Sequence, residues 1–355
     1  MDNSDYDSLV VGSGFSAYCA DAFLKQLDTG RHKVISPKDH LLTSQNKYHH
    51  HFTFNRLLAP KAKSVGSSSW KVPGVRLVDR VTLGGNMNIW GGYIDLDLVD
   101  FRYLDVLSGM TPIKVTSDLH GIDSNRNLGV LTNDDGTIFN GGTALNSNLI
   151  NEYVTRMELL GDKTIKLFSR YYDQHSTYQA SVIFLCLGVV QLLELLSRSN
   201  LLRSGDRIKI HEHSYQLAYG TQIQESILSD CDTYIRYKFP IAVGRRLGSR
   251  RLDYGMLNRG PYVVSQLFQK TLQSVELVYQ QDEKCFSTVS ESKVPRNFGS
   301  SIHYFGVEIN SLDINTFFQE RGLNVFSFGH GSISPGRGGP ISNYIINDIG
   351  KHFSL

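Results

Sequence analysis

The sequence lacks several features that would place it in a specialised class of proteins. Its four cysteines, among 355 residues, form no C-x-x-C pair, which indicates free thiols in a reducing compartment rather than a disulfide framework. The formal net charge is only +2, so bulk charge gives no reason to expect a polyanionic partner. Internal repeats and low-complexity tracts are also missing.

Long apolar runs and targeting signals are missing as well. The longest apolar run, near residues 182–196, is interrupted by Gly188, Gln191 and Glu194, and it is shorter than the roughly 20 residues of a membrane-spanning helix. The first residues are acidic, and no positively charged segment precedes a cleavable apolar one. These absences predict a soluble, cytoplasmic protein without a membrane span.

The composition instead supports an ordinary folded core. Apolar residues make up 41% of the chain and aromatic residues 11%. A chain of this length can hold one large α/β domain and a smaller companion.

A glycine-bearing turn near the start carries the first functional signal. Residues 12–17 read G-S-G-F-S-A; they follow a short apolar run at 7–11 and open a helical pattern that extends to residue 27. A second apolar run at 32–35 completes a βαβ unit. Glycine permits the tight turn and the approach of a pyrophosphate to the helix N-terminus. The predicted dinucleotide contacts of this turn are Gly12, Gly14, Phe15, Ser16 and Ala17.

A second glycine-bearing stretch narrows the choice of dinucleotide. Residues 82–92 read T-L-G-G-N-M-N-I-W-G-G, and residues 93–101 read Y-I-D-L-D-L-V-D-F. Together they resemble the flavin-contacting segment of the glucose-methanol-choline (GMC) oxidoreductases, whose bacterial members read GG-x-x-x-x-WGG followed by D-x-x-DF. The resemblance implies that FAD is contacted by Gly84, Gly85, Asn86, Met87, Asn88, Trp90 and Gly91. For Trp90, plain core packing is the alternative.

Two later segments resemble the same family, in the same order. Residues 181–197 are similar to its strand, glycine and helix that return to the FAD domain. Residues 331–340, with the helix expected after them, are similar to the C-terminal segment that covers the flavin. The flavin contacts implied by these segments are Gly188, Gly331, Ser332, Pro340 and Ile341.

The resemblance implies an α/β fold with a Rossmann-type FAD-binding domain and a smaller antiparallel-sheet substrate domain. The FAD domain would be discontinuous, with residues 1–106, 140–210 and 299–355, and the substrate domain would hold residues 107–139 and 211–298. Alternating, aromatic-rich stretches such as 232–239 and 275–279 are typical of antiparallel strands. The polar residues 39–69 predict an irregular segment.

His303 is the candidate catalytic base. It stands in S-I-H-Y-F-G at residues 301–306, which resembles the family's H-x-x-G-T segment, although Val307 replaces the threonine. A strand histidine bonded to a backbone carbonyl is the alternative. The family places a second histidine or asparagine before the proline of its C-terminal motif, where this chain has Gly339. Asn343 or His330 would then hold the substrate oxygen, with His330 in the place of a family aspartate.

Two further expectations concern how FAD is held. Asp39 follows the second strand at the loose spacing of an acidic residue that binds the adenosine ribose, and a loop aspartate is the alternative. Some family members bind FAD covalently through a histidine before the tryptophan. Ile89 stands in that place, which predicts non-covalent FAD.

Three groups of histidine or arginine residues are further candidates for a functional role. Residues 49–51 are consecutive histidines, which cannot all face one ion, so we expect a solvated loop and no metal site. His211 and His213 would lie on one face of a strand, and the segment resembles a family segment near the flavin. The basic residues Arg245, Arg246, Arg250 and Arg251 either bind a phosphate-bearing or carrier-linked substrate or form an exposed loop. No nucleic-acid motif accompanies them.

The sequence therefore predicts an FAD-dependent oxidoreductase of GMC type. It would transfer hydride from a C–OH, or a related C–H, of a small metabolite to flavin N5, with a histidine as base. Two alternatives stay open: a flavin-dependent isomerase, cyclase or desaturase, and a degenerate flavoprotein scaffold that binds a partner.

Overall fold

The structure is a computed structural model. It describes residues 4–28, 30–37, 67–72, 75–80, 83–85, 92–116, 122–134, 136, 138–139, 141–161, 163–220, 228–229, 231–239, 245–247, 251–253, 262–289, 298, 304–334 and 340–353.

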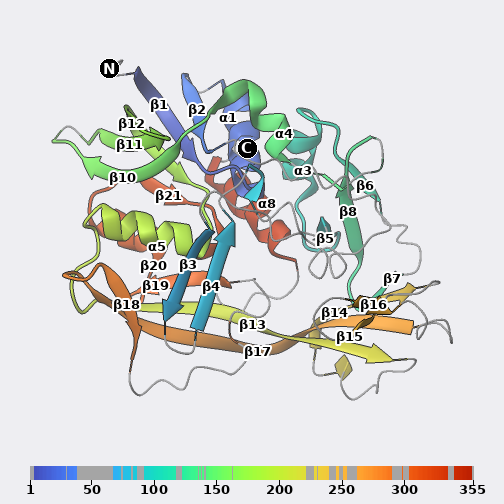
Figure 1. The fold of residues 1–355 in the computed structure, drawn as a ribbon. Coiled ribbons are helices and arrows are strands. Elements are labelled where there is room, and N and C mark those ends of the chain that lie inside the picture. Colours follow the sequence, from blue (N-terminus) through green and yellow to red (C-terminus); the bar gives the residue numbers. More distant parts are fainter. Residues whose placement is uncertain are drawn as a thin grey trace.

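The first layer is a mostly parallel sheet, sheet A, in the order β10-β11-β12-β1-β2-β9, with β21 also paired to β12 (Figure 1). Its strands are β1 (Ser4–Val11), β2 (His32–Ile35), β9 (Leu149–Ile150), β10 (Tyr153–Leu159), β11 (Ile165–Tyr171), β12 (Gln174–Leu185) and β21 (Val325–Ser327). β10 and β11 run antiparallel as an extension of the sheet, whereas β9, β2, β1, β12 and β21 are parallel.

Helices cover both faces of sheet A. The helical segments are α1 (Phe15–Leu27), α3 (Phe101–Ser108), α4 (Gly141–Ala144), η2 (Leu145–Asn148), α5 (Val189–Arg198), α7 (Ile314–Glu320), η3 (His330–Ser332) and α8 (Ile341–Phe353). α5 belongs to the core on the face that includes Leu9 and Ile183, and α1 and α8 belong to the core around Val10 and Phe184. Burial on both faces explains why these strands are apolar runs rather than alternating ones.

The second layer is a large antiparallel sheet in the order β20-β19-β13-β17-β14-β7, with β18 paired to β17. It lies along the lower part of Figure 1. Its strands are β7 (Ile122–Ser124), β13 (Arg207–Gly220), β14 (Cys231–Phe239), β17 (Tyr262–Gln280), β18 (Cys285–Thr288), β19 (Tyr304–Ile309) and β20 (Leu312–Asp313). Every pairing within it is antiparallel.

Three small sheets complete the described elements. A three-stranded sheet has the order β5-β8-β6, with β5 (Tyr93–Asp95), β6 (Lys114–Thr116) and β8 (Leu128–Thr132). Two hairpins pair β3 (Ser67–Val72) with β4 (Val75–Arg80), and β15 (Arg245–Leu247) with β16 (Arg251–Asp253).

The predicted α/β class is confirmed, together with most of the elements that carry it. The βαβ unit, the helix α5 and the antiparallel strands at 231–239 and 262–280 all form. α5 forms because its valines and leucines face the core while Gln191 and Glu194 lie at its half-buried positions; each fully buried Val or Leu contributes about 1.5–3 kcal/mol. β19, near the C-terminus, pairs with β13.

One local prediction is wrong. Residues 67–69 were expected to belong to an irregular polar segment, but they begin β3, because their backbone pairs with residues 78–80 of β4. The rest of that segment, including the three consecutive histidines, lies outside the described residues.

A side chain covers the outer edge of β21. Asn315, at the start of α7, accepts a hydrogen bond from the Ser327 N–H at 2.7 Å and donates one to the Ser327 carbonyl oxygen at 3.2 Å. Both backbone groups of Ser327 that face this edge are therefore satisfied without a neighbouring strand.

None of the helices in the described part of the chain combines the length and the apolar content that crossing a membrane requires.

Candidate functional site

The first glycine turn joins three strand ends of sheet A. Gly12 has φ +117°, a region that residues with side chains rarely adopt, and a Cβ there would collide with the carbonyl oxygen of Cys186. The Gly12 N–H donates to the Ile35 carbonyl oxygen at 2.9 Å. Only a glycine allows the ends of β1, β2 and β12 to approach this closely.

Gly14 ends the turn and caps α1. An added Cβ there would meet no atom of the described residues within 4 Å, so the space beside Gly14 is open. This space lies at the N-terminus of a 13-residue helix, where the helix dipole and the first N–H groups favour an anion such as a pyrophosphate. Phe15, Ser16 and Ala17 form the first turn of α1 and are buried.

The second glycine segment meets this turn. The Gly84 N–H donates to Ser13 Oγ at 3.1 Å, and the Ser36 hydroxyl, just after β2, donates to the same oxygen at 2.8 Å. A Cβ on Gly85 would lie 3.8 Å from the Gly14 Cα. Two motifs that are 71 residues apart in the chain therefore line one place beside α1.

Two other predicted flavin contacts lie at neighbouring strand ends. Gly188 follows β12 and caps α5. A Cβ on Gly331, after β21, would lie 2.7 Å from a methyl carbon of Leu192 on α5. Both glycines are thus at the carboxyl ends of parallel strands, where open α/β sheets bind their ligands.

The remaining predicted contacts of the C-terminal segment flank residues that the structure does not describe. The Ser332 hydroxyl donates to the Gly329 carbonyl oxygen at 2.8 Å. Pro340 and Ile341 stand at the start of α8, and all three predicted residues are half-buried.

His330 lies in η3, directly after the end of β21. Its side chain is half-buried, and the surrounding protein withdraws water from the imidazole, which lowers the pKa of His330 to about 4. The imidazole is therefore neutral near pH 7. At that pKa it is a weak proton acceptor.

His211 and His213 lie on one face of β13, as predicted. Their rings lie 6.4 Å and 4.8 Å from the Phe305 ring of β19. Burial lowers the pKa of His213 below its ordinary value, and the nearby carboxylate of Asp232 opposes this shift. His211 forms a 3.2 Å contact with Glu308.

Asn343 is fully buried in α8 and holds the backbone of β5. Its Oδ1 accepts from the Asp95 N–H at 2.8 Å, and its Nδ2 donates to the Asp95 carbonyl oxygen at 2.6 Å. Four residues on, Asn347 makes the same kind of contact with Asp100 and Leu98. The amide of Asn343 is thus occupied by the protein itself.

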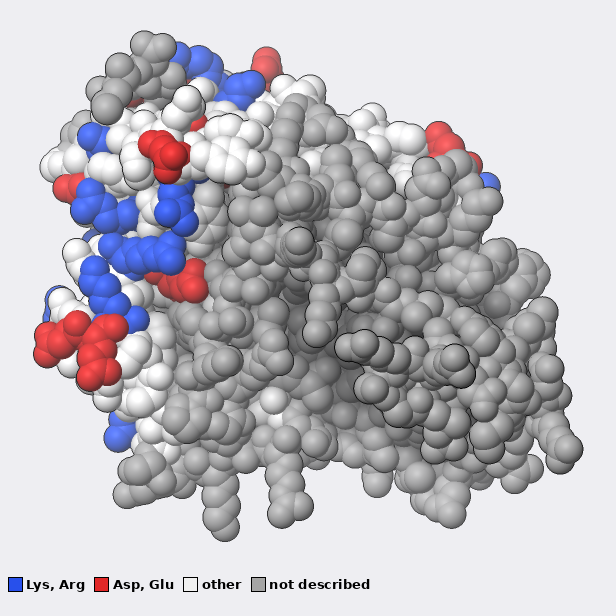
Figure 2. Space-filling model, in the orientation of Figure 1, with Lys and Arg blue, Asp and Glu red and all other residues white. Residues whose placement is uncertain are grey.

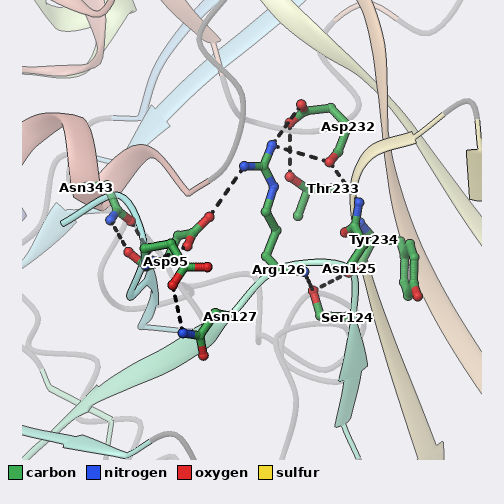
Figure 3. Close-up of polar contacts among 10 residues, drawn as sticks. Asp95, Ser124, Asn125, Arg126, Asn127, Asp232, Thr233, Tyr234 and Asn343 are labelled. Carbon is green, nitrogen blue, oxygen red and sulfur yellow. Dashed lines mark hydrogen bonds and ion pairs between the residues drawn. The ribbon is translucent and has the colours of Figure 1, made fainter.

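A charged cluster that sequence reasoning missed lies beside this contact (Figure 3). The Arg126 guanidinium lies between Asp95 and Asp232, at 3.4 Å and 2.9 Å from their carboxylates. Asp95 stands inside the motif stretch that resembles a flavin segment, but nothing in the sequence marks Arg126 or Asp232 as its partners.

Several predicted site residues lie outside the described residues, and their roles stay predictions. They are His303, Asp39, Asn86, Met87, Asn88, Trp90 and Gly91. The backbones of Arg245, Arg246 and Arg251 lie in the β15–β16 hairpin, and Arg250 is outside the described residues.

A cavity of about 450 Å³ lies apart from the glycine segments, between α7, β21 and α8. Ser332 is on its wall, together with Phe328, Asp348 and His352, whereas the glycine turns are not. In the described ranges, no group of three or more His, Cys, Asp or Glu side chains has the arrangement of a metal site.

Among the described residues on the face shown in Figure 2, basic side chains lie beside acidic ones. On β10 and β11, the Arg156 guanidinium lies 4.0 Å from the centre of the Phe168 ring and forms a 3.5 Å ion pair with Glu158. Such local partners are typical of a solvated face rather than of a binding patch.

The chain was compared with known families, curated proteins and solved structures. No family model and no curated protein matches it. Its structure is similar to pyridoxine 4-oxidase from Mesorbium loti, with a TM-score of 0.56 and 12% identity over 98% of each chain. It is also similar to a formate oxidase from Aspergillus oryzae RIB40, with a TM-score of 0.55 and 7% identity over 99% of each chain.

Both similar structures are GMC oxidoreductases. The chain therefore has the GMC fold, a parallel-sheet layer with an antiparallel sheet beside it, as the sequence resemblance predicted. At identities this low the likeness extends to the fold and not to the residues of a site.

Proposed function

We propose that the chain is an FAD-dependent oxidoreductase of GMC type that acts on a small molecule. One observation carries the proposal. The two glycine segments meet at the N-terminus of α1, where the space beside Gly14 is open and Gly85 lies next to Gly14. A dinucleotide needs such backbone-lined space, since any side chain there would occupy the place of its phosphates.

The residues present fit FAD. Ser13 ties the second glycine segment to the first through the Gly84 N–H, and Ser36 supports Ser13 from the end of β2. We propose that the first turn of α1 binds the pyrophosphate and that the binding is non-covalent, since Ile89 replaces the histidine of covalent family members. The FAD domain would comprise residues 1–106, 140–210 and 299–355, and the substrate domain residues 107–139 and 211–298.

When bound, FAD would accept a hydride at N5 from a carbon of the substrate. For this chain, we propose that His303 takes the hydroxyl proton in its neutral form and that neutral His330 holds the substrate oxygen. The similar structures are named as oxidases of pyridoxine and of formate, which supports a small-molecule substrate. A CH–OH donor and a phosphate-bearing or carrier-linked substrate held by Arg245, Arg246, Arg250 and Arg251 are the finer parts of this proposal.

A second candidate is a flavin-dependent isomerase, cyclase or desaturase. One observation favours it: the amide of Asn343, a predicted substrate contact, is bound to the backbone of Asp95. Aerobic re-oxidation of substrate-reduced protein separates the two candidates, because net oxidation consumes an acceptor in each turnover. A bound flavin that no substrate bleaches would instead favour a scaffold role.

FAD binding is tested with two matched glycine variants. We expect the purified chain to be yellow and to release FAD on denaturation. Gly14→Val should fold but lose FAD, because the valine enters the phosphate space. Gly161→Val is the control, since an added Cβ at Gly161 also meets nothing within 4 Å but lies in the β10–β11 turn. A colourless wild type that FAD cannot reconstitute would refute the proposal.

The role of His303 is tested by flavin reduction. With a substrate found by anaerobic bleaching of the flavin over a metabolite panel, His303→Ala should keep FAD while its reduction slows by about 10² to 10⁴. The wild-type rate should also fall as the pH drops through the pKa of the base, because an imidazolium has no lone pair to accept a proton. Full reduction rates in a yellow His303→Ala protein would assign the base elsewhere.

A further inference from the structure

A short turn carries the chain from the large antiparallel sheet to the small β5-β8-β6 sheet. β7 ends at Ser124 after pairing with three residues of β14, and β8 begins at Leu128 and pairs with β5. Asn125, Arg126 and Asn127 lie between them. This turn is therefore a direct covalent link between the two sheets.

Arg126 is bonded to both sheets at once (Figure 3). Its Nη1 lies 3.4 Å from Asp95 Oδ2 at the end of β5, and its Nη2 lies 2.9 Å from Asp232 Oδ1 at the start of β14. The same Nη2 also donates to the Asp232 carbonyl oxygen at 3.4 Å. A guanidinium suits this bridge because its donors spread in a rigid plane.

The residues on either side of Arg126 also hold the turn in place through hydrogen bonds. The Ser124 hydroxyl donates to the Tyr234 carbonyl oxygen at 2.7 Å, and the Tyr234 N–H donates to Asn125 Oδ1 at 2.9 Å. On the other side, Asn127 Nδ2 donates to Asp97 Oδ1 at 2.9 Å. These contacts hold the backbone on both sides of Arg126, so that ordering its side chain costs mainly rotamer freedom, about 1.5–2 kcal/mol.

The two ends of the bridge contact different parts of the fold. Asp95 is 1% exposed, and Asn343 of α8 holds its backbone, while α8 packs on α1 in one apolar core. Burial lowers the pKa of His213, and the carboxylate of Asp232 opposes that shift. The bridge thus connects the helix layer of the glycine turns to the histidine-bearing face of the large sheet.

Charged groups approach His213 from several elements. β14 contributes Asp232, and the β7–β8 turn contributes Arg126 bonded to it. On β13 itself, His211 and Glu212 are neighbours, and Glu308 of β19 faces His211. Leu272 is the cross-strand partner on β17 and brings no charge.

We propose that Arg126 is a positioning residue that holds the large sheet against the β5 layer and fixes the place of the Asp232 carboxylate at the start of β14. This inference rests on the proposed function in one respect, namely that the face bearing His213 is turned toward the flavin. The contacts of Arg126 with Asp95 and Asp232 involve no atom of FAD.

Hydrogen exchange tests the bridge. In Arg126→Met, we expect faster amide exchange both in β5 and in β14, because the guanidinium contacts both strands. Arg207→Met is the control: Arg207 lies exposed on β13 of the same sheet, with one 3.4 Å ion pair to Glu276, and should change neither segment. Arg126→Lys, which keeps the charge on a single point donor, should retain protection on one side. Unchanged exchange in β5 and β14 of Arg126→Met would overturn the bridge.

Histidine NMR titration of the full chain tests the place of the Asp232 carboxylate. The His213 resonance is identified by its loss in His213→Gln. We expect Arg126→Met to raise the titration midpoint of His213, because Asp232 is then no longer neutralised. Asp232→Asn should lower it, and the double variant should fall between the two. Equal midpoints in the wild type and in both single variants would overturn that placement.

The same samples are titrated with FAD, which separates this inference from the proposed function. A protein that binds no FAD but gives the expected shifts would retain the bridge and lose the flavin proposal. A yellow protein whose His213 titration midpoint is unchanged by the Arg126 and Asp232 substitutions would retain the flavin proposal and overturn the inference about Arg126.

Discussion

The glycine turns of sheet A and the junction around Arg126 hold sequence-distant segments together in opposite ways. At the turns, segments approach because side chains are missing: Gly12 lies against the Cys186 carbonyl, and Gly85 lies beside Gly14. At the junction they are joined because side chains are present, since four consecutive residues, 124–127, each bond to another segment.

The difference determines what each region tolerates. An added carbon at Gly12 would collide with the Cys186 carbonyl, so this position accepts no residue other than glycine, whereas the space beside Gly14 admits one carbon. A hydrogen-bonded junction spreads its stability over several contacts, and each of them can be removed separately. Four predictions follow this contrast from the largest effect to the smallest.

The two glycines of the first turn should differ sharply in stability. Gly12→Ala places a Cβ against the Cys186 carbonyl at φ +117°, and we expect a loss of roughly 3 kcal/mol or more. Gly14→Ala meets open space and should change the free energy of unfolding by no more than about 0.5 kcal/mol. Urea unfolding measures both, and equal losses would contradict the close approach at Gly12.

The two asparagines of α8 should rank by burial. Asn343→Ala leaves the buried N–H of Asp95 without its partner, while the Asp95 carbonyl oxygen still accepts from the Leu98 and Val99 N–H groups. We expect this to cost about 2–3 kcal/mol. Asn347→Ala removes equivalent bonds to Asp100 and Leu98 at a more exposed place and should cost about 1 kcal/mol. Thermal unfolding of both variants is the measurement, and a reversed order would mean that the β5 layer is not anchored by Asn343.

Asp21, on α1, joins sequence-distant segments through side-chain hydrogen bonds, as the residues around Arg126 do. Burial alone would raise the pKa of Asp21. Hydrogen bonds from His32, Lys25 and Asn148 outweigh this effect and hold the pKa of Asp21 below its ordinary value. The resulting stability is therefore fully present above about pH 4 and is lost as the pH falls through the lower, folded-state pKa. Asp21→Asn should be less stable than the wild type by about 1.5–3 kcal/mol at pH 7. The gap should narrow below about pH 4, and a gap that is constant with pH would argue against an ionised Asp21.

The smallest effect is expected at the N-terminal cap of α7. Asp313 accepts hydrogen bonds from the Asn315 and Thr316 N–H groups at the start of α7. Asp313→Ala should cost about 1 kcal/mol and should leave FAD binding unchanged. Chemical denaturation and a flavin titration check the two parts, and lost FAD would tie α7 to the site.

The contrast also explains what the sequence could predict. The βαβ unit, α5 and the convergence on α1 were accessible because glycine spacing and apolar periodicity are local patterns with few physical solutions. The antiparallel sheet was accessible from alternation in its longer strands. The family resemblance supplied the order of these parts, and the similar structures bear out the fold that it implied.

The junction was not accessible, because its partners are common residues at unrelated positions. Arg126 is 31 residues from Asp95 and 106 from Asp232, and what brings them together is the pairing of β7 with β14 over three residues. A three-residue strand leaves no periodic pattern. Asn343 illustrates the same difficulty: a polar residue near a motif suggests a ligand contact, whereas its amide here is bound to a backbone that only the fold brings near.

The Asn315 amide at the edge of β21 has a consequence for how copies of this protein meet. The outer edge of a parallel sheet is a template on which another chain can add a strand. Here the Ser327 N–H and carbonyl already bond to Asn315, so an incoming strand must first displace that amide. The Asn315 side chain therefore hinders strand addition at the Ser327 end of β21, and the helix that carries it, α7, packs against the same strand.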